Sequence, residues 1–448
     1  MSTFGRLWLW LRNSLWFVPT LIVVGSMIAA LVLVDSSGYV DDDLVKHWPR
    51  VFGAGADGSR EMLAAIATSM ITVAGVVFSI TIVALSLAST QYSPRVLRNF
   101  MRDRPTQVVL GAFVGSYAYC LLVLRTVRGG DDLIFIPALA VLGAMVYAFV
   151  AIALLIYFIH HVAQSIQASA ILGRIFDDAS ASVDDMFPET VGAPAAEQAQ
   201  GSISLPRIWS AVTAQRNGYV TAVAGKPLLE LAVECGRVLR LRVGTGDFVL
   251  EGSVLAELEG SAEVSPELAA RLRKLVALGR QRTPEQDPAF GIQQMVDIAV
   301  KALSPGINDP TTACMCLDQL GALVVRLSGR RMPDARRMEG DRLRLILPVP
   351  DFRSLADLAF VAIIYHSRGD VQVLCRVLNQ LDAAEARITD ARRRRVLSRI
   401  AAAVVRKLGG AERSVEAVLA RRRGQRLVQK LRGSASNASA PAHGAQPG

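Results

Sequence analysis

Five hydroxyl side chains recur along one uncharged stretch of the chain at a spacing that suits solute transport. Segment 68–90 reads TSMITVAGVVFSITIVALSLAST. At about 100° per residue in a helix, the five fall within an arc of roughly 40° that runs for roughly 33 Å. They are Thr68, Thr72, Ser79, Ser86 and Thr90. Such a hydroxyl stripe can line a water-filled path at the axis of an oligomer.

The same stripe has a second interpretation. Small hydroxyl residues let membrane helices pack closely, and their hydroxyls bond to neighbouring helices or to their own backbone. Both interpretations stay open on the sequence alone. Segment 68–90 holds no ionisable residue, so a proton relay or a fixed-charge ion site within it is not expected.

A basic loop follows the stripe. It reads QYSPRVLRNFMRDR and carries four arginines, which are Arg95, Arg98, Arg102 and Arg104. Such residues commonly set topology and contact phospholipid headgroups. If the stripe lines a path, they lie at its inner mouth and favour anions.

A second polar cluster lies in segment 281–321. Its candidate residues are Arg282, Asp287, Asn308, Asp309 and Thr311. Helix N-termini bind anions through free amides, so a small anionic ligand is one interpretation. The alternative is structural: these residues cap a tight helix–turn–helix corner, with Asp309 as N-cap before Pro310 and an ion pair between Arg282 and Asp287.

Enzyme motifs are missing from the sequence. It contains no P-loop, GxSxG, HExxH or dinucleotide fingerprint. We therefore expect no catalytic residue, no cofactor and no metal site, and we do not expect an enzyme.

Four uncharged runs dominate the first third of the chain. The 448 residues are 52% hydrophobic and 20% charged. Each run is long enough to cross a hydrocarbon core, which takes about 20 residues of helix. We predict a transmembrane domain over 15–172, after an N-terminal segment 1–14, with spans at about 15–34, 63–90, 106–124 and 133–159.

The charges of the short loops predict orientation. Arg6 and Arg12 precede the first span with no acidic residue, segment 35–61 is acidic, and segment 95–104 is basic. By the positive-inside rule, the N-terminus and everything after about residue 160 lie in the cytoplasm. We expect a multi-pass protein of the bacterial inner membrane, with His160 and His161 as interfacial anchors.

The rest of the chain predicts a cytosolic α+β region. We expect a linker over 173–206, a small β module over 207–262, a mainly helical domain over 263–432 and a disordered tail over 433–448. Strands are predicted at 217–223, 228–234, 238–243 and within 246–258. The spacing of Gly246, Val249, Gly252 and Leu255 resembles the hairpin of lipoyl- and biotinyl-type half-barrel modules, without an exposed lysine at the tip.

The C-terminal helices are strongly basic. Residues 392–432 carry 14 Lys and Arg and a net charge of +12, whereas the whole chain is +10. Val396, Ile400, Val404 and Leu408 suggest an apolar face. Such helices favour anionic lipid headgroups. We expect the bilayer, these headgroups and further copies of the chain as partners, and no nucleic acid.

Four segments carry a family resemblance. They are NSLWFVPT (13–20), FSITIVALSLASTQYSPRVLRNFMRDR (78–104), YFIHHVAQSIQ (157–167) and QRTPEQDPAFGIQQMVDIAVKALSPGINDPTTACMCLDQLG (281–321). They resemble a widespread bacterial family of predicted membrane proteins, a domain of unknown function. The resemblance implies four spans and a cytosolic domain, and it implies no activity.

Two functions follow as expectations. The first is an oligomeric channel or passive transport protein, whose second span lines the path and whose cytosolic domain assembles or gates it. The alternative is a membrane-anchored scaffold or sensor that binds a cytosolic partner or a small anionic ligand.

Overall fold

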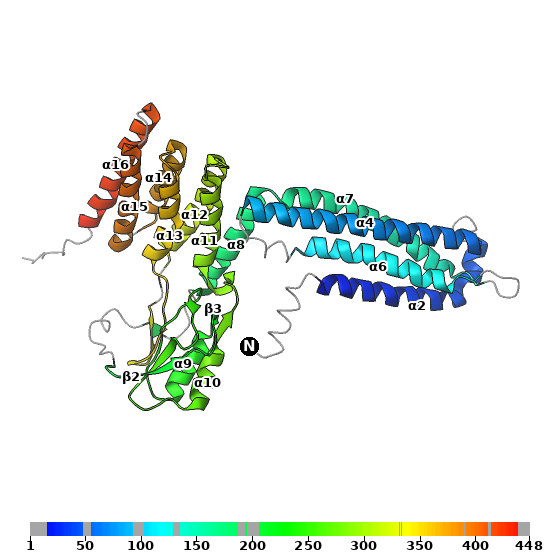
Figure 1. Ribbon diagram of the computed structural model, residues 1–448, viewed down its shortest axis with the longest axis horizontal. Coiled ribbons are helices and arrows are strands. Elements are labelled where there is room, and N and C mark those ends of the chain that lie inside the picture. Colours follow the sequence, from blue (N-terminus) through cyan, green and yellow to red (C-terminus); the bar gives the residue numbers. More distant parts are fainter. Residues whose placement is uncertain are drawn as a thin grey trace, which may run out of the picture. The chain divides into compact units, whose positions relative to one another are not determined.

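The computed structural model of the chain divides into two compact units, Met1–Ile171 and Leu172–Gly448, and each is described by itself. The structure describes residues 16–47, 55–92, 103–128, 135–186, 193–194, 206–330, 332, 334–388, 390–410 and 414–437. Figure 1 shows the elements of both units.

The first unit is a bundle of four helices: α2 (Phe17–His47), α4 (Ala56–Gln91), α6 (Arg104–Thr126) and α7 (Ala138–Ser165). All four are long and apolar enough to cross a membrane. The four predicted spans are therefore confirmed. A helix pairs its own backbone N–H and C=O groups, which is necessary because the lipid hydrocarbon offers them no hydrogen-bond partner.

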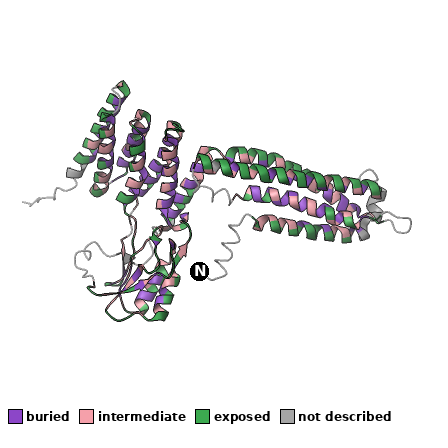
Figure 2. Ribbon diagram, viewed as in Figure 1, coloured by how far each residue is buried: buried purple, intermediate pink, exposed green. Residues whose placement is uncertain are grey.

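Helix α6 is the core of this bundle. In its most apolar stretch 56% of the residues are buried, against at most 22% in the other three helices, and Figure 2 shows the contrast. The sequence GAFVG places Gly111 and Gly115 one turn apart, where both face α2. Small residues at this spacing let two membrane helices approach closely.

The second unit contains two sheets. The larger has the order β1-β8-β9-β4-β6-β2, in which β4 and β9 are parallel and the other pairs antiparallel. The smaller is β5-β3-β7 and is antiparallel. The strands are β1 (Ala193–Pro194), β2 (Trp209–Thr213), β3 (Gly218–Val223), β4 (Leu239–Leu241), β5 (Phe248–Val249), β6 (Val254–Glu259), β7 (Val276–Gly279), β8 (Arg336–Glu339) and β9 (Arg342–Ile346).

One apolar core joins these sheets to two short helices, α9 (Gly225–Glu234) and α10 (Pro266–Leu275). Leu239, Leu255, Leu258 and Leu345 are fully or almost fully buried in it. Strands β1, β7, β8 and β9 come from outside segment 207–262, so the sheets draw on more of the chain than the expected β module. Strands β5 and β6 lie in different sheets, so the segment around Gly252 is not a two-stranded hairpin.

Three local expectations need correction. Segment 228–234, expected as a strand, belongs to helix α9, which buries Leu228, Leu231 and Ala232. This spacing of one helical turn outweighs the short apolar run. Helix α8 (Ala168–Met186) occupies the start of the expected linker, and α16 extends to Asn437, into the expected tail. Residues 438–448 lie outside the described part of the chain.

The remaining helices pack in sequence order as a layered array (Figure 1). They are α11 (Pro288–Ala302), α12 (Pro310–Ser328), α13 (Phe352–His366), α14 (Val371–Glu385), α15 (Ala391–Gly409) and α16 (Val415–Asn437). The first five all begin after an aspartate whose carboxylate accepts a backbone N–H. An N-cap of this kind satisfies one of the free donors at a helix start.

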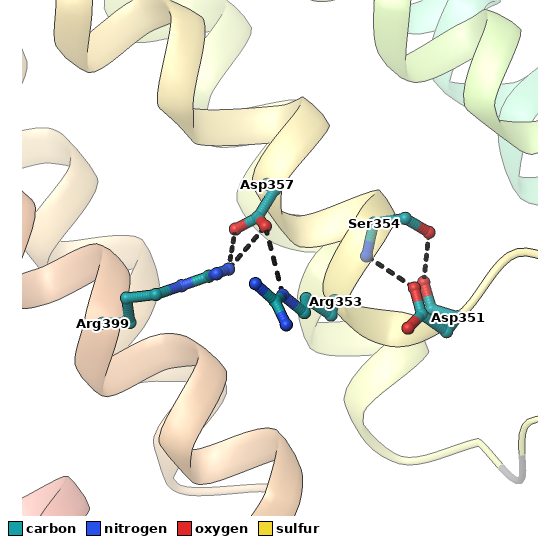
Figure 3. A network of polar contacts seen from close by, with 5 residues as sticks. All are labelled: Asp351, Arg353, Ser354, Asp357 and Arg399. Carbon is teal, nitrogen blue, oxygen red and sulfur yellow. Dashed lines mark hydrogen bonds and ion pairs between the residues drawn. The ribbon is translucent and has the colours of Figure 1, made fainter.

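Ion pairs connect the array. Figure 3 shows Asp351 capping α13 through the N–H of Ser354, and further along the same helix Asp357 meeting Arg399 of α15. The N–H of Ser354 lies 2.8 Å from the carboxylate of Asp351. Arg353 approaches the same carboxylate at 3.8 Å. The aspartates therefore begin helices and also hold neighbouring helices together.

The basic C-terminal helices use their apolar face inside the unit. Ile400, Val404 and Leu408 are buried against neighbouring helices. Arg393 donates to the carbonyls of Leu327 and Ser328 at 3.1 and 2.8 Å. This apolar face is therefore already covered, and part of the positive charge serves the fold.

Candidate functional site

The hydroxyl stripe lies on the free side of α4. Helix α4 packs into the bundle through Leu63, Ala67, Met70, Ala74 and Val77. At about 100° per residue, the stripe is centred roughly opposite this packed face. All of its members are exposed in one copy of the chain: Thr68, Thr72, Ser79, Ser86 and Thr90.

The hydroxyls of the stripe differ in their hydrogen bonds. Thr72 donates to the carbonyl of Thr68 at 2.8 Å, and Thr90 donates to that of Ser86 at 3.0 Å. Within the described residues, Ser79 and Ser86 have no side-chain hydrogen bond. Gly75 lies between Thr72 and Ser79 in the sequence. A Cβ atom added to Gly75 would have no heavy atom within 4 Å. Among the described residues, no other helix of the same copy therefore covers α4 at Gly75.

Of the four arginines of the basic loop, the structure describes one. Arg95, Arg98 and Arg102 lie outside the described residues. Arg104 is the first residue of α6 and is exposed.

Asp103, next to Arg104, pairs with His161, and the sequence alone does not predict this pair. His161 Nε2 lies 2.8 Å from Asp103 Oδ2, and the two side chains are only 15% and 11% exposed. Thr106 also donates to this carboxylate at 2.6 Å, and His161 stacks on Tyr157. Because His161 follows Asp103 by 58 positions, no spacing motif reveals the pair. It ties the end of α7 to the start of α6.

The corner of segment 281–321 is built around a buried ion pair. Arg282 Nε and Nη2 lie 2.8 and 2.7 Å from Asp287 Oδ2, and Asp287 also caps α11 by accepting the N–H of Phe290 at 3.1 Å. Burial raises the pKa of Asp287, while Arg282 acts in the opposite direction. Gly246 has a φ of 91°, and a Cβ there would lie 2.4 Å from Asp287 Oδ2. The glycine therefore makes room for the pair.

The other half of the corner is a helix cap. Asp309 accepts the N–H and the hydroxyl of Thr312 at 3.0 and 2.5 Å, which confirms it as the N-cap of α12. These bonds lower the pKa of Asp309. Asn308 adopts a φ of 49°, as the residue before a tight helix start, and Thr311 is exposed.

These contacts use the polar groups of the corner internally. Asp287 and Asp309 each cap a helix, and Arg282 neutralises the first of them. This geometry is compatible with the structural alternative, in which the corner fixes a turn. Among the described residues, no group of three or more His, Cys, Asp or Glu side chains is arranged to hold a metal ion.

The fold and these sites define a class of protein. It is a membrane protein with four apolar helices at its N-terminus, followed by a unit with small sheets and many helices. Residues 12–383 match the model of a family described as predicted membrane protein (DUF2254). The chain belongs to this family, as the resemblance of the four segments indicates.

Relatives support the same assignment. Uncharacterized proteins of Mycobacterium bovis and Mycobacterium tuberculosis are each 34% identical to this chain over 406 residues. The match covers 89% of this chain and 76% of each relative. No solved structure matches the chain.

Proposed function

We propose that the protein is an oligomeric channel or passive transport protein of the bacterial inner membrane, with α4 lining the path. The observation that carries this proposal is the position of the hydroxyl stripe. It lies opposite the face through which α4 packs into its own bundle, and it is exposed over its full length.

The energetics of a bilayer favour a partner for this face. A hydroxyl without a hydrogen bond is costly in hydrocarbon, and Ser79 and Ser86 find no partner among the described residues of their own copy. A second copy, or water enclosed between copies, supplies one. Thr72 and Thr90 bond to their own backbone and so tolerate lipid. The two serines therefore argue most strongly for assembly.

The surroundings of α4 fit this arrangement. Exposed apolar side chains flank the stripe, among them Val76, Ile80 and Val83, and suit lipid or a helix contact. On the orientation proposed from the loop charges, Arg104 and the three arginines before it lie at the cytoplasmic end and favour anions there. Anionic lipid headgroups are the proposed partners of the arginines that α15 and α16 leave at the surface.

Ion flux tests the proposal. Purified protein in liposomes should release potassium chloride faster than protein-free liposomes. Replacing Thr72, Ser79 and Ser86 together by Leu should abolish this flux without unfolding the protein, because the path loses its hydroxyls. A matched control replaces Val76, Ile80 and Val83 by Leu on the same helix and should keep the flux. Equal flux in both triple variants would contradict the proposal.

A membrane-anchored sensor is the second candidate function. One specific observation favours it: a cavity in the second unit is lined by a buried arginine. In this case the second unit binds a small anionic ligand and no solute needs to cross.

A further inference from the structure

The cavity is formed by parts of the chain that lie far apart in sequence. It measures about 250 Å³, slightly below the roughly 300–1,000 Å³ usual for small-molecule sites. Much of its wall is apolar and comes from Val223, Leu241, Val243 and Leu347. Polar groups on its wall belong to Thr245, Gln286 and Arg337.

Arg337 is the unusual member of this wall. It is only 8% exposed, and its Nε is buried with no hydrogen-bond partner in the described part of the chain. Its Nη1 donates to the backbone carbonyls of Asp334 and Arg336. The carboxylate of Asp334 is close enough to act on its charge, yet no ion pair with Arg337 forms within the described residues. A buried guanidinium without a counter-ion is costly for the fold.

The local backbone explains how this side chain becomes buried. Arg337 pairs with Leu345, which is buried in the apolar core of the sheets, whereas Met338 pairs with Leu343 and packs with it in a second cluster. Successive side chains of a strand point to opposite faces of the sheet, and here both faces are covered. Arg337 therefore lies against the cavity and not in the solvent. Burial lowers the pKa of its guanidinium, but arginine keeps its charge in proteins.

A second group of donors meets the same cavity. Helix α9 begins at Gly225, which lines the wall, and its N-cap residue Ala224 offers no side-chain acceptor. The first N–H groups of a helix point outward and carry partial positive charge. An uncapped helix start beside a cavity is suited to an anion.

The amide of Gln286 completes the arrangement. Its Oε1 accepts the N–H of Val223 at 2.9 Å, which holds the side chain at the wall. Its Nε2 makes no hydrogen bond within the described residues, and the wall contains no carboxylate. The cavity thus joins a buried cation, a helix start and an amide donor to an apolar surface.

From these contacts we propose that the cavity binds a small organic anion, with Arg337 as counter-ion to its carboxylate or phosphate group. The apolar wall takes the body of the molecule, and the start of α9 donates to the anionic oxygens. The site is distinct from the corner at Asp287 and Asp309, whose polar groups are already paired. This cavity is the ligand site that the proposed sensor function requires. The proposal does not depend on a path along α4.

Binding is measured on the full-length protein in detergent. The probes are inorganic phosphate and butyrate, each compared with chloride at equal ionic strength, and the readout is the midpoint of thermal unfolding. At least one probe should raise the midpoint to a plateau, because ligands of the folded state stabilise it. A response to phosphate alone or to butyrate alone tells which anionic group the site prefers.

Two variants decide whether Arg337 is the counter-ion. Arg337→Met should abolish the response and leave the probe-free midpoint equal or higher, since it removes an uncompensated charge. Arg342→Gln is the matched control, because Arg342 lies in neighbouring β9 and is exposed. It should keep the full response. No saturable response to either probe, or the same response in Arg337→Met, would overturn the proposal.

A measurement on the unaltered protein covers the case in which Arg337→Met does not fold. Hydrogen exchange with and without the responding probe should slow at the first amides of α9. It should not change at the start of α10, which Ser265 caps. Unchanged exchange at α9 would also contradict the site. Because both readouts report binding, failure here is separable from failure of the flux experiment.

Discussion

At the scale of single residues, the corner of segment 281–321 depends on a glycine that is distant in sequence. Gly246 combines a positive φ with a close approach to the ion pair between Arg282 and Asp287. Positive φ disfavours residues with a Cβ. The contact adds a second restriction that the sequence alone does not reveal.

Replacing Gly246 by Ala should therefore destabilise the protein more than backbone strain alone does. Strain of this kind costs of the order of 1–3 kcal/mol, and the new methyl group also displaces Asp287. Gly252→Ala is the matched control, because Gly252 has a φ of 80° but no heavy atom within 4 Å. Thermal unfolding of both variants measures the difference. Equal losses of stability in the two variants would show that displacing the ion pair costs no free energy.

The cap of α12 predicts a pH dependence. Asp309→Ala should lower stability by about 0.5–2 kcal/mol at neutral pH, the usual cost of losing an N-cap. The pKa of Asp309 is lowered in the fold because Thr312 donates to its carboxylate. Its contribution is therefore fully present above the unfolded value of about 3.9 and disappears as pH falls through the lower folded value.

Unfolding midpoints of the unaltered protein and of Asp309→Ala, measured from pH 7 downward, test this dependence. The two midpoints should converge below about pH 3.9. Glu263→Ala, at an exposed loop position, should follow the unaltered protein throughout. A constant gap between the midpoints at all pH values would show that the charge of Asp309 contributes nothing.

At the scale of elements, the contact between α2 and α6 should control the stability of the bundle. A Cβ at Gly111 would lie 2.9 Å from the backbone Cα of Pro19 and 2.9 Å from Ile22 Cδ1. Backbone cannot move aside as a side chain can, so Gly111→Ala should force α2 away from α6. Overpacking typically costs about 1–3 kcal/mol.

The control for Gly111→Ala is Gly75→Ala in α4. Gly75 has open space around it in one copy, so its methyl group should not lower the stability of the bundle. Thermal unfolding in detergent compares the two. A larger loss from Gly75→Ala would mean that the free face of α4, and not the contact between α2 and α6, limits stability.

Elements were predictable from sequence where one local pattern was decisive. The four spans follow from uncharged runs of sufficient length, and the cap at Asp309 follows from a polar residue before proline. Segment 228–234 was misjudged because a short apolar run fits a buried strand and an amphipathic helix equally well. The burial of Leu228 and Leu231 one turn apart shows which applies.

At the scale of the whole molecule, the sites missed by sequence analysis are those made by distant segments. Asp103 meets His161 across the bundle. Arg337 lies in a charged segment, MPDARRMEGDR, that is typical of a solvated surface. It becomes buried because it lies opposite Leu345 of β9, on the face of the sheet that meets a cavity formed by β3, β4 and α9. Long-range pairing of this kind leaves no local periodicity to read.

If the protein is the channel proposed above, water reaches the hydroxyl stripe of α4. The most direct test is modification of Ser79→Cys by a membrane-impermeant thiol reagent in lipid vesicles. Ile80→Cys, exposed on the same helix about 100° from the centre of the stripe, is the control, and labelling of the parent chain, whose Cys120 is buried, is subtracted. A water-filled path predicts rapid modification of Ser79→Cys and slow modification of Ile80→Cys. Slow modification at both positions, as expected for a face in lipid, would contradict the proposed path.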